Sequence, residues 1–229
     1  MWRSISWPKL CVAQVTSINM EGTMSRIFVL LCILLSAQFT FAAEGETLKS
    51  DSKETWGWRT AMMTSLMLTL ASNPLDADEF SVTPMSSTDV GGLKFGFRWY
   101  PNEVIGNLAG AEITHYYLFA YNYWQSTVVD GQEGVVNGLE FIPVFRLNWS
   151  YNNLLSFVET SVGASVLSRN QINDRQLSTN FQFSNSLAFG GYFTPKSTWT
   201  LQLQHYSNNS IKLPNNGINF YNLNFAFRY

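Results

Sequence analysis

Cysteine, charged residues and long apolar runs are all scarce in this sequence, and each scarcity excludes a class of protein. Only two cysteines occur, Cys11 and Cys32, both near the N-terminus. Charged residues make up 13% of the chain, well below the roughly 25% of an ordinary soluble domain. Beyond residue 42 there is no apolar run of the roughly 20 residues that a transmembrane helix needs, which excludes a helical membrane span in that part.

The first 42 residues have the features of a leader. Residues 24–26 (Met-Ser-Arg) precede an apolar run over 27–37, and residues 40–42 (Thr-Phe-Ala) offer a small-residue cleavage site, as in a secretory signal peptide. We expect Met24 to be the true start, or residues 1–23 to be removed as part of a longer leader. Cleavage after Ala42 leaves 187 of the 229 residues, with a polar tail over 43–54 and one domain over 55–229.

The expected mature chain excludes further kinds of site and partner. It lacks both cysteines, so neither a disulfide framework nor a cysteine-based metal site can form. Its 11 Lys and Arg against 15 Asp and Glu give a net charge of −4 without a basic patch, which argues against a nucleic-acid partner.

What the sequence does have is a regular alternation of apolar and polar side chains. The chain is 46% hydrophobic and 15% aromatic, and its apolar residues repeat with a period of two, which places them on one face of a strand. Eight segments show this period: residues 55–70, 90–100, 108–124, 138–149, 154–167, 177–193, and the two halves of the stretch 199–229. Their polar faces carry the charged residues Lys94, Arg98, Glu112, Glu140, Arg146, Glu159 and Arg228.

Two observations favour a barrel in a membrane over a barrel in water. Aromatic residues gather at strand ends, as in interfacial girdles: Trp56, Trp58, Trp99, Tyr123, Trp149, Trp199 and Tyr229. Connections also alternate, long over 71–87, 125–136, 168–176 and 208–218 and short near 101–106, 150–153 and 194–197, like external loops and periplasmic turns. The sequence therefore predicts an all-β fold, an eight-stranded antiparallel transmembrane β-barrel of the outer membrane. Such a barrel is filled by side chains, which argues against transport, and its last strand ends on an aromatic residue, a signal for the barrel-assembly machinery.

One polar pair interrupts the apolar face of the last hairpin. Trp199, Leu201 and Leu203 alternate, and His205 and Ser207 continue their phase. At a rise of about 2.3 Å per residue along the membrane normal, the pair reaches the upper part of an apolar band about 25 Å tall. A serine hydroxyl becomes a nucleophile when an adjacent base takes its proton and a third group orients that base. The pair is therefore a candidate catalytic site for an acylated lipid; alternatively, it only contacts headgroups at the interface.

The second histidine is expected to be structural. His115 lies among Tyr116, Tyr117 and Phe119, where a tyrosine-rich strand end offers it hydrogen bonds. It has no Ser or Cys two residues away, so it is a weaker candidate for a catalytic base than His205.

Residues 201–229 resemble a known family. His205-Tyr206-Ser207-Asn208, followed by Pro214-Asn215-x-Gly217-Ile218, closely resembles the lipid A 3-O-deacylases (PagL-like), which are small outer-membrane barrels. The resemblance implies hydrolysis, without a metal or other cofactor, of the ester that holds the 3-position hydroxyacyl chain of lipid A in lipopolysaccharide. It implies His205 as general base, Ser207 as nucleophile, Asn208 with nearby backbone amides as oxyanion donors, and Asn215 as support for the loop. The site would face the outer leaflet from the outside of the barrel wall, in a protein that is a monomer or a dimer.

One position departs from the family pattern. Where the family has a Glu after the Gly-Ile pair to orient the histidine, this chain has Asn219. An amide oxygen can accept the imidazole N–H and hold a tautomer, but it cannot stabilise the imidazolium by charge. We therefore expect a slow enzyme oriented by Asn219, an enzyme that uses another orienting group, or an inactive relative.

Two other hypotheses compete with a lipid A esterase. One is a non-catalytic small barrel that anchors loops or braces the membrane. The other is a different lipid-modifying activity, such as acyl transfer or phospholipid hydrolysis.

Overall fold

The computed structural model describes residues 64–65, 72–101, 103–127, 134–151 and 153–229. Its strands are β1 (Glu79–Ser86), β2 (Val90–Trp99), β3 (Gly106–Leu108), β4 (Ala111–Ser126), β5 (Val135–Asn148), β6 (Phe157–Leu167), β7 (Gln171–Ile172), β8 (Arg175–Gln176), β9 (Phe181–Thr194), β10 (Ser197–Ser207) and β11 (Ile218–Arg228). Within these described ranges no helix is long and apolar enough to cross a membrane.

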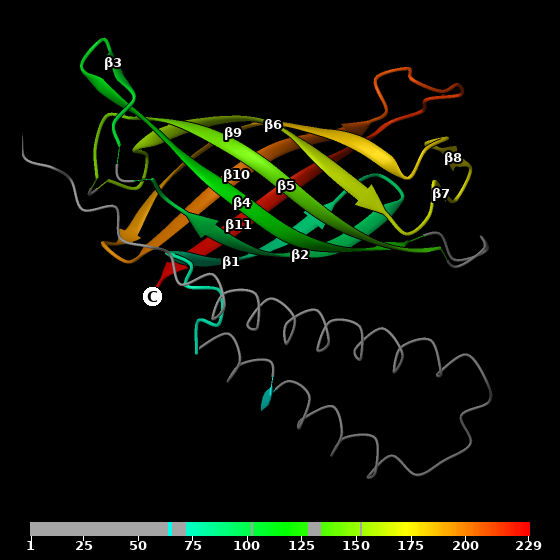
Figure 1. The fold of residues 1–229 in the computed structure, drawn as a ribbon, viewed down its shortest axis with the longest axis horizontal. Helices are drawn as coiled ribbons and strands as arrows, with labels where there is room; N and C mark the ends of the chain where they lie inside the picture. The colour runs from blue at the N-terminus through cyan, green and yellow to red at the C-terminus, as the bar shows by residue number, and fades with distance from the viewer. Residues whose placement is uncertain (1–63, 66–71, 102, 128–133, 152) are drawn as a thin grey trace, which may run out of the picture. The chain divides into compact units, whose positions relative to one another are not determined.

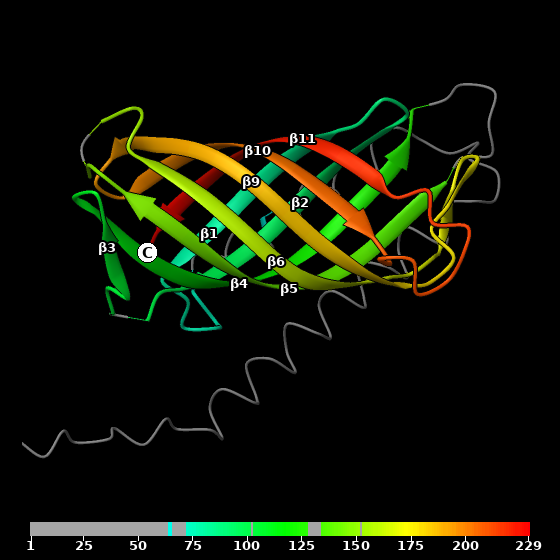
Figure 2. The ribbon, with the colours of Figure 1, turned by 90° about the horizontal axis from the view of Figure 1, so that it is seen from above.

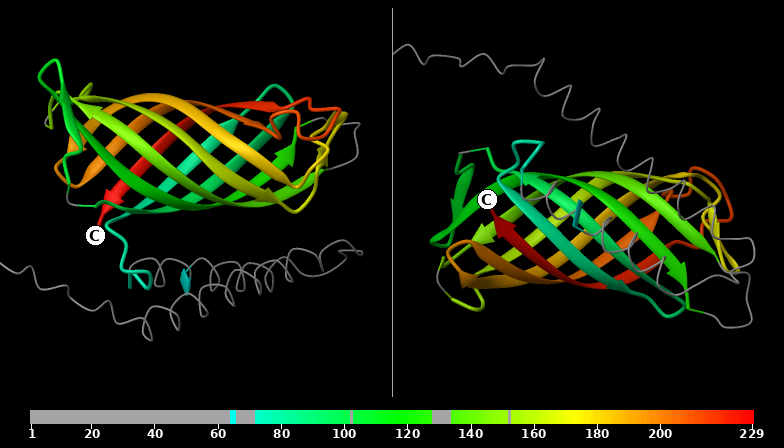
Figure 3. Two further views of the ribbon diagram at one scale, coloured as in Figure 1. Left: turned by 45° about the horizontal axis from the view of Figure 1, so that its top comes forward. Right: turned by 90° about the horizontal axis from the view of Figure 1, so that it is seen from below.

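Eight of these strands form a closed antiparallel barrel (Figures 1 and 2). Neighbours follow the order β2-β1-β11-β10-β9-β6-β5-β4, and β4 pairs with β2 to close the ring. The short β3 extends only the start of β4, and β7 and β8 form a separate small hairpin. The strands are steeply inclined to the barrel axis in both views of Figure 3, as a closed sheet requires. The predicted all-β, eight-stranded barrel is thus confirmed.

The position of the first strand was predicted wrongly. The expected strand over 55–70 falls almost wholly outside the described residues, and the two that are described, Thr64 and Ser65, are helical. The first barrel strand is instead β1, in a region expected to be a long loop. Its inward side chains are mostly polar and it contains Pro84, which weakens a strand signal. The pairing of β1 with β11 is interrupted at positions 83 and 84, where proline lacks an N–H to donate.

This correction also changes the predicted alternation of loop lengths. The connection between β1 and β2 comprises only residues 87–89, although it lies at the same end as the longer connections β4–β5, β6–β9 and β10–β11. The opposite end holds the β2–β4 connection with β3, the turns before β6 and β10, and the C-terminus (Figure 1). The other six connections lie where the sequence predicts them, but their lengths do not alternate as predicted. The β2–β4 connection over 100–110 and the β5–β6 connection over 149–156, both expected to be short, are at least as long as the β4–β5 connection over 127–134.

The outward face of the wall is apolar, as the alternation predicts. Exposed aliphatic and aromatic side chains cover it: Leu93, Leu139, Phe141, Phe145, Val158, Val162, Val166, Leu187, Phe189, Leu201, Leu203 and Leu223. A continuous apolar wall of this kind is suited to contact with lipid and unsuited to water.

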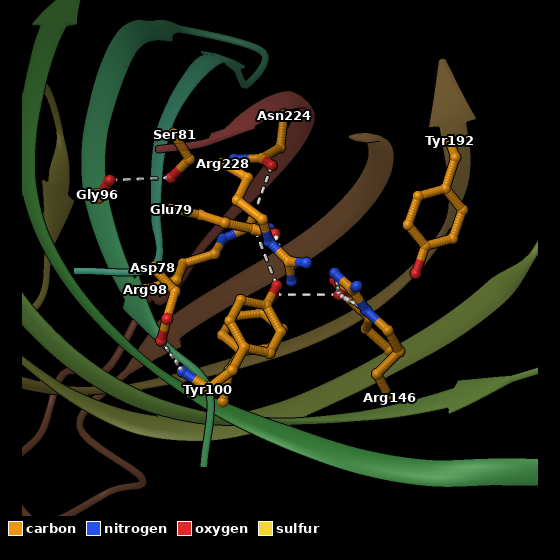
Figure 4. A network of polar contacts seen from close by, with 12 residues as sticks. Asp78, Glu79, Ser81, Gly96, Arg98, Tyr100, Arg146, Tyr192, Asn224 and Arg228 are labelled. Carbon is orange, nitrogen blue, oxygen red and sulfur yellow. Dashed lines mark hydrogen bonds and ion pairs between the residues drawn. The ribbon is translucent and has the colours of Figure 1, made fainter. Parts of the chain in front are cut away.

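The interior is polar and its charges are paired. Three ion pairs cross it, Lys94–Glu140 at 3.1 Å, Arg98–Glu79 at 3.4 Å and Arg146–Glu159 at 2.6 Å. Figure 4 shows the charged residues at the C-terminal end of the barrel, with Tyr100 lying among the arginines. The Tyr100 hydroxyl donates a hydrogen bond to Glu79 at 2.8 Å. Two residues assigned to the same polar face do not belong to this buried set. Glu112 is half-buried and bonds Tyr151, and the Arg228 side chain is 53% exposed, because both lie at the barrel's end.

Removing one interior charge should destabilise the barrel strongly. Glu140 receives hydrogen bonds from Asn122 at 2.5 Å and from the Tyr206 hydroxyl, and it neutralises the fully enclosed Lys94. Glu140→Ala leaves that ammonium buried and unpaired, so we expect a loss of about 3–5 kcal/mol in the free energy of unfolding. Urea unfolding in lipid vesicles measures it.

Glu112→Ala is the matched control, because it removes a half-buried carboxylate that bonds a tyrosine at the barrel's end. We expect its unfolding free energy to change by less than about 1 kcal/mol. Equal losses in the two variants would show that the interior pair contributes no more than a surface contact.

Candidate active site

The C-terminal end of β10 presents two polar side chains on the outside of the barrel. His205 and Ser207 share the outward phase of Leu201 and Leu203, and both are half-buried. Tyr206, between them, is fully buried and packs edge-on against Trp124 with ring centroids 4.8 Å apart. Because successive side chains of a strand point to opposite faces, this inward anchor holds its two neighbours outward.

The neighbouring strand β11 supplies a partner for the imidazole. His205 lies directly opposite Asn219 in the register, and its Nδ1 is 2.7 Å from the Asn219 Oδ1. A carbonyl oxygen can only accept a hydrogen bond, so this contact favours the tautomer with its proton on Nδ1. The lone pair of Nε2 is then free to accept a proton, as a general base requires.

Gly217 brings the backbone against the edge of the imidazole ring. Its φ is +52°, and a Cβ at this position would lie 2.9 Å from the His205 Cε1 and 3.1 Å from the Tyr206 carbonyl oxygen. Only glycine accepts both the positive φ and this close approach. The corner before β11 therefore restricts the imidazole from one side, while Asn219 holds it from another.

Asn208 and Asn215 hold the loop that follows the pair. The Asn208 side chain is fully buried, and its Nδ2 donates to the carbonyls of Leu177 and Lys212, both at 2.8 Å. Its backbone N–H donates to the Asn215 Oδ1 at 3.2 Å. The prediction of Asn208 as an oxyanion donor is therefore not supported, because position 208 points inward and its donors are already bonded. Asn215 accepts this hydrogen bond from within the same loop, which is compatible with the loop-supporting role expected for it.

Within the described part of the chain, no hydrogen bond joins the Ser207 hydroxyl to the imidazole. The two side chains share a face and are two residues apart, so they are neighbours on the outer side of the strand. Catalytic hydrogen bonds commonly tighten only when substrate binds.

A cluster of loop residues, which the sequence did not reveal, holds the Gly217 corner in place. Arg175 donates to the Gly217 carbonyl at 3.0 Å and pairs with Asp89 at 3.1 Å. Asn173 also donates to the Asp89 carboxylate, at 3.2 Å. We call Asp89, Asn173, Arg175 and Gly217 the loop clamp; it joins the β1–β2 turn, the β7–β8 hairpin and the start of β11. No motif marks these residues, because they meet only when the barrel closes.

The loop clamp should depend on pH only under acidic conditions. Burial tends to raise the pKa of Asp89, but the Asn173 hydrogen bond and the Arg175 charge outweigh it and lower that pKa below its ordinary value of 3.8. A lowered pKa means that the carboxylate stabilises the fold above 3.8, and that this stabilisation is lost as the pH falls through the folded value. We therefore expect the NMR signal of the Arg175 guanidinium to stay constant from neutral pH down to about pH 4 and to shift below it. Asp89→Asn should abolish that shift, and a transition near neutral pH would contradict the assignment.

The two histidines lie on opposite walls. His115 is on β4, which is separated from β10 by three strands in either direction around the ring. It stacks on Phe145 with ring centroids 6.3 Å apart. Its contacts are ring packing and not the expected tyrosine hydrogen bonds, because its buried Nδ1 has no hydrogen-bond partner among the described residues. His205 is the histidine beside Ser207.

Comparisons with known proteins identify the family and the fold. A family model described as "Lipid A 3-O-deacylase (PagL)" matches residues 90–228, a range that includes His205, Ser207 and Asn219. The lipid A deacylase PagL of Pseudomonas aeruginosa is 27% identical over 131 residues, which are 57% of this chain and 73% of that protein. The lipid A deacylase PagL of Bordetella bronchiseptica is 30% identical over 110 residues, 47% of this chain and 58% of that protein. A crystal structure of the outer membrane enzyme PagL has a TM-score of 0.58 and 22% identity, and the alignment covers 66% of this chain and 99% of that one.

Proposed function

This chain belongs to the lipid A 3-O-deacylase (PagL) family, and we propose that it hydrolyses the ester holding the 3-position hydroxyacyl chain of lipid A. Its closed eight-stranded barrel with an apolar outer wall is that of an outer-membrane protein. We further propose that the reaction takes place in the outer leaflet, at the end of the wall that carries His205 and Ser207.

The proposed chemistry begins with proton transfer inside the pair. The His205 Nε2 accepts the Ser207 proton while the Ser207 Oγ attacks the acyl carbonyl, which gives a tetrahedral oxyanion and an imidazolium. The imidazolium then protonates the departing sugar oxygen, and the ester to the sugar breaks as an acyl-serine forms. Water, deprotonated by the same nitrogen, attacks the acyl-serine, and the hydroxy fatty acid leaves with Ser207 regenerated.

A single observation carries this proposal: the Asn219 Oδ1 holds the His205 Nδ1 at 2.7 Å on the lipid-facing side of the wall. That contact orients a base two residues from a serine on the same strand face, where a lipid ester can reach both.

The contact between Asn219 and His205 also leads us to expect a slow reaction. Asn219 is neutral, so it stabilises the imidazolium of the proposed reaction less than the carboxylate that the family pattern has at this position. A non-catalytic barrel is the alternative that this substitution favours, and it predicts a different result in the experiment that follows.

The mass of lipid A tests the proposal. We expect lipid A from cells that express the chain to lose one hydroxyacyl chain relative to cells with an empty vector, in only a fraction of molecules because the reaction is slow. An unchanged mass spectrum across growth conditions would favour the non-catalytic barrel. Loss of a chain from phospholipids, or its transfer to another lipid, would indicate a different lipid-modifying activity.

A further inference from the structure

The connection between β10 and β11 carries two unusually exposed aliphatic side chains just beyond Ser207. Ile211 is 66% exposed and Leu213 is 73% exposed. The neighbouring connection over 168–180 shows the opposite pattern, because its apolar residues Ile172 and Leu177 are 1% and 0% exposed and its exposed residues are polar. Among the described connections at this end of the barrel, exposure of aliphatic side chains is therefore confined to this one loop.

The loop is held so that these side chains stay outside. The Lys212 carbonyl, between them, accepts the hydrogen bond of the buried Asn208 amide at 2.8 Å, and the Ile211 N–H donates to the Asn208 carbonyl at 3.1 Å. The loop is also tied to the connection over 168–180, because the Asn216 N–H donates to the Gln176 carbonyl at 3.1 Å. Figure 2 shows the two connections side by side at one end of the barrel. These hydrogen bonds fix the loop backbone in a position where both aliphatic side chains are exposed.

The exposed pair continues the lipid-facing wall past the active site. Leu201 and Leu203 lie below His205 on β10, and Tyr221 lies below Asn219 on β11, all exposed on the apolar face. Ile211 and Leu213 follow on the other side of the reactive pair. Two aliphatic side chains held in water are unfavourable, and contact with an acyl chain removes that cost.

We propose that Ile211 and Leu213 form a lip that contacts the acyl chain of the lipid substrate and holds it across Ser207. This inference rests on the proposed function, and it assigns the loop to recognition of the long hydrocarbon chain of the ester. The lip contributes binding to long-chain esters and nothing to the reaction of a short one.

A first experiment measures contact with lipid and needs no activity. In a chain with Cys11→Ser and Cys32→Ser, spin labels are placed one at a time by Ile211→Cys, Leu213→Cys, Leu203→Cys and Arg169→Cys, in vesicles that contain lipopolysaccharide. We expect labels at 211 and 213 to be relaxed mainly by oxygen, like the wall position 203. The label at 169, an exposed site on the neighbouring loop, should be relaxed mainly by a water-soluble nickel reagent. Labels at 211 and 213 that behave like the one at 169 would overturn the lip.

A second experiment separates the lip from the chemistry. Ile211→Ser with Leu213→Ser should lower kcat/KM for long-chain lipid A by about tenfold or more, since each buried aliphatic side chain contributes substantially to binding. Hydrolysis of a short-chain ester should be unchanged. The control is Leu154→Ser with Leu155→Ser, an exposed pair at the opposite end of the barrel, which should change neither rate.

The outcomes distinguish this inference from the proposed function. An equal loss on long and short esters, or no loss on either, would overturn the lip while leaving the esterase in place. If the unaltered protein cleaves neither ester but labels 211 and 213 still report lipid, the proposed function fails and the loop remains a lipid-contacting element.

Discussion

Ser207→Ala is expected to abolish removal of the hydroxyacyl chain, with a fall in rate of at least about 10³-fold. The variant loses the oxygen that forms the acyl intermediate, and the only other hydroxyl in this phase of β10, that of Ser197, is eight residues from His205. The measurement is the fraction of lipid A that loses one chain, by mass spectrometry, in purified membranes. Because Ser207 is half-buried on the outer face and bonds no interior group, the barrel should fold and unfold as before.

Ser210→Ala is the matched control for this experiment. Ser210 is an exposed hydroxyl in the same loop, and the substitution keeps its backbone N–H. We expect unchanged activity. If lipid A processing survives in the Ser207 variant, the proposed nucleophile is wrong, and loss in both variants would point to a disturbed loop.

Asn219→Glu is expected to raise the rate, by about 10- to 10³-fold. The opposite change of carboxylate to amide in a serine protease lowers turnover about 10⁴-fold, and the gain here is smaller because Asn219 already holds a tautomer. Asn219 is exposed and lies directly opposite His205, so a carboxylate at this position can accept the Nδ1 proton and stabilise the imidazolium without a change in the register. Initial rates of acyl-chain release measure the effect.

Asn219→Gln separates charge from length. Glutamine has the length of glutamate without its charge, so it should not raise the rate. Equal gains in the two variants would show that the short side chain of Asn219, and not its lack of charge, limits the reaction rate. A fall in both would show that a group other than residue 219 orients the imidazole.

Most of the barrel strands could be predicted because the alternation of apolar and polar residues in a strand depends only on nearby positions in the sequence. Seven of the eight barrel strands follow from period-two alternation, and the outward direction of His205 and Ser207 follows from the phase of Leu201 and Leu203. β1 could not be predicted in this way. Its outward face has only two apolar residues, Phe80 and Val82, before Pro84 and Ser86, so the apolar alternation is too short to mark a strand. Pro84 lowers its strand propensity further. Only the ring, which needs a strand between β2 and β11, identifies it.

The candidate site also has a part that could be predicted from the sequence and a part that could not. Alternation along β10, together with the phase of Asn219 on β11, places a base, a nucleophile and an orienting group on one face, since side-chain direction in a strand depends on position alone. The roles of the loop residues could not be assigned from position. Asn208 turns inward and uses its amide to bind Leu177, which is 31 residues earlier in the chain.

The sequence by itself determined a thin-walled barrel with an apolar exterior and a polar pair projecting from it, because these features depend only on neighbours one or two residues apart. The tertiary structure alone decided which loops hold that pair in place. Arg175 meets Gly217 across 42 residues and Asp89 across 86, and such contacts exist only after ring closure brings three connections to one end of the barrel.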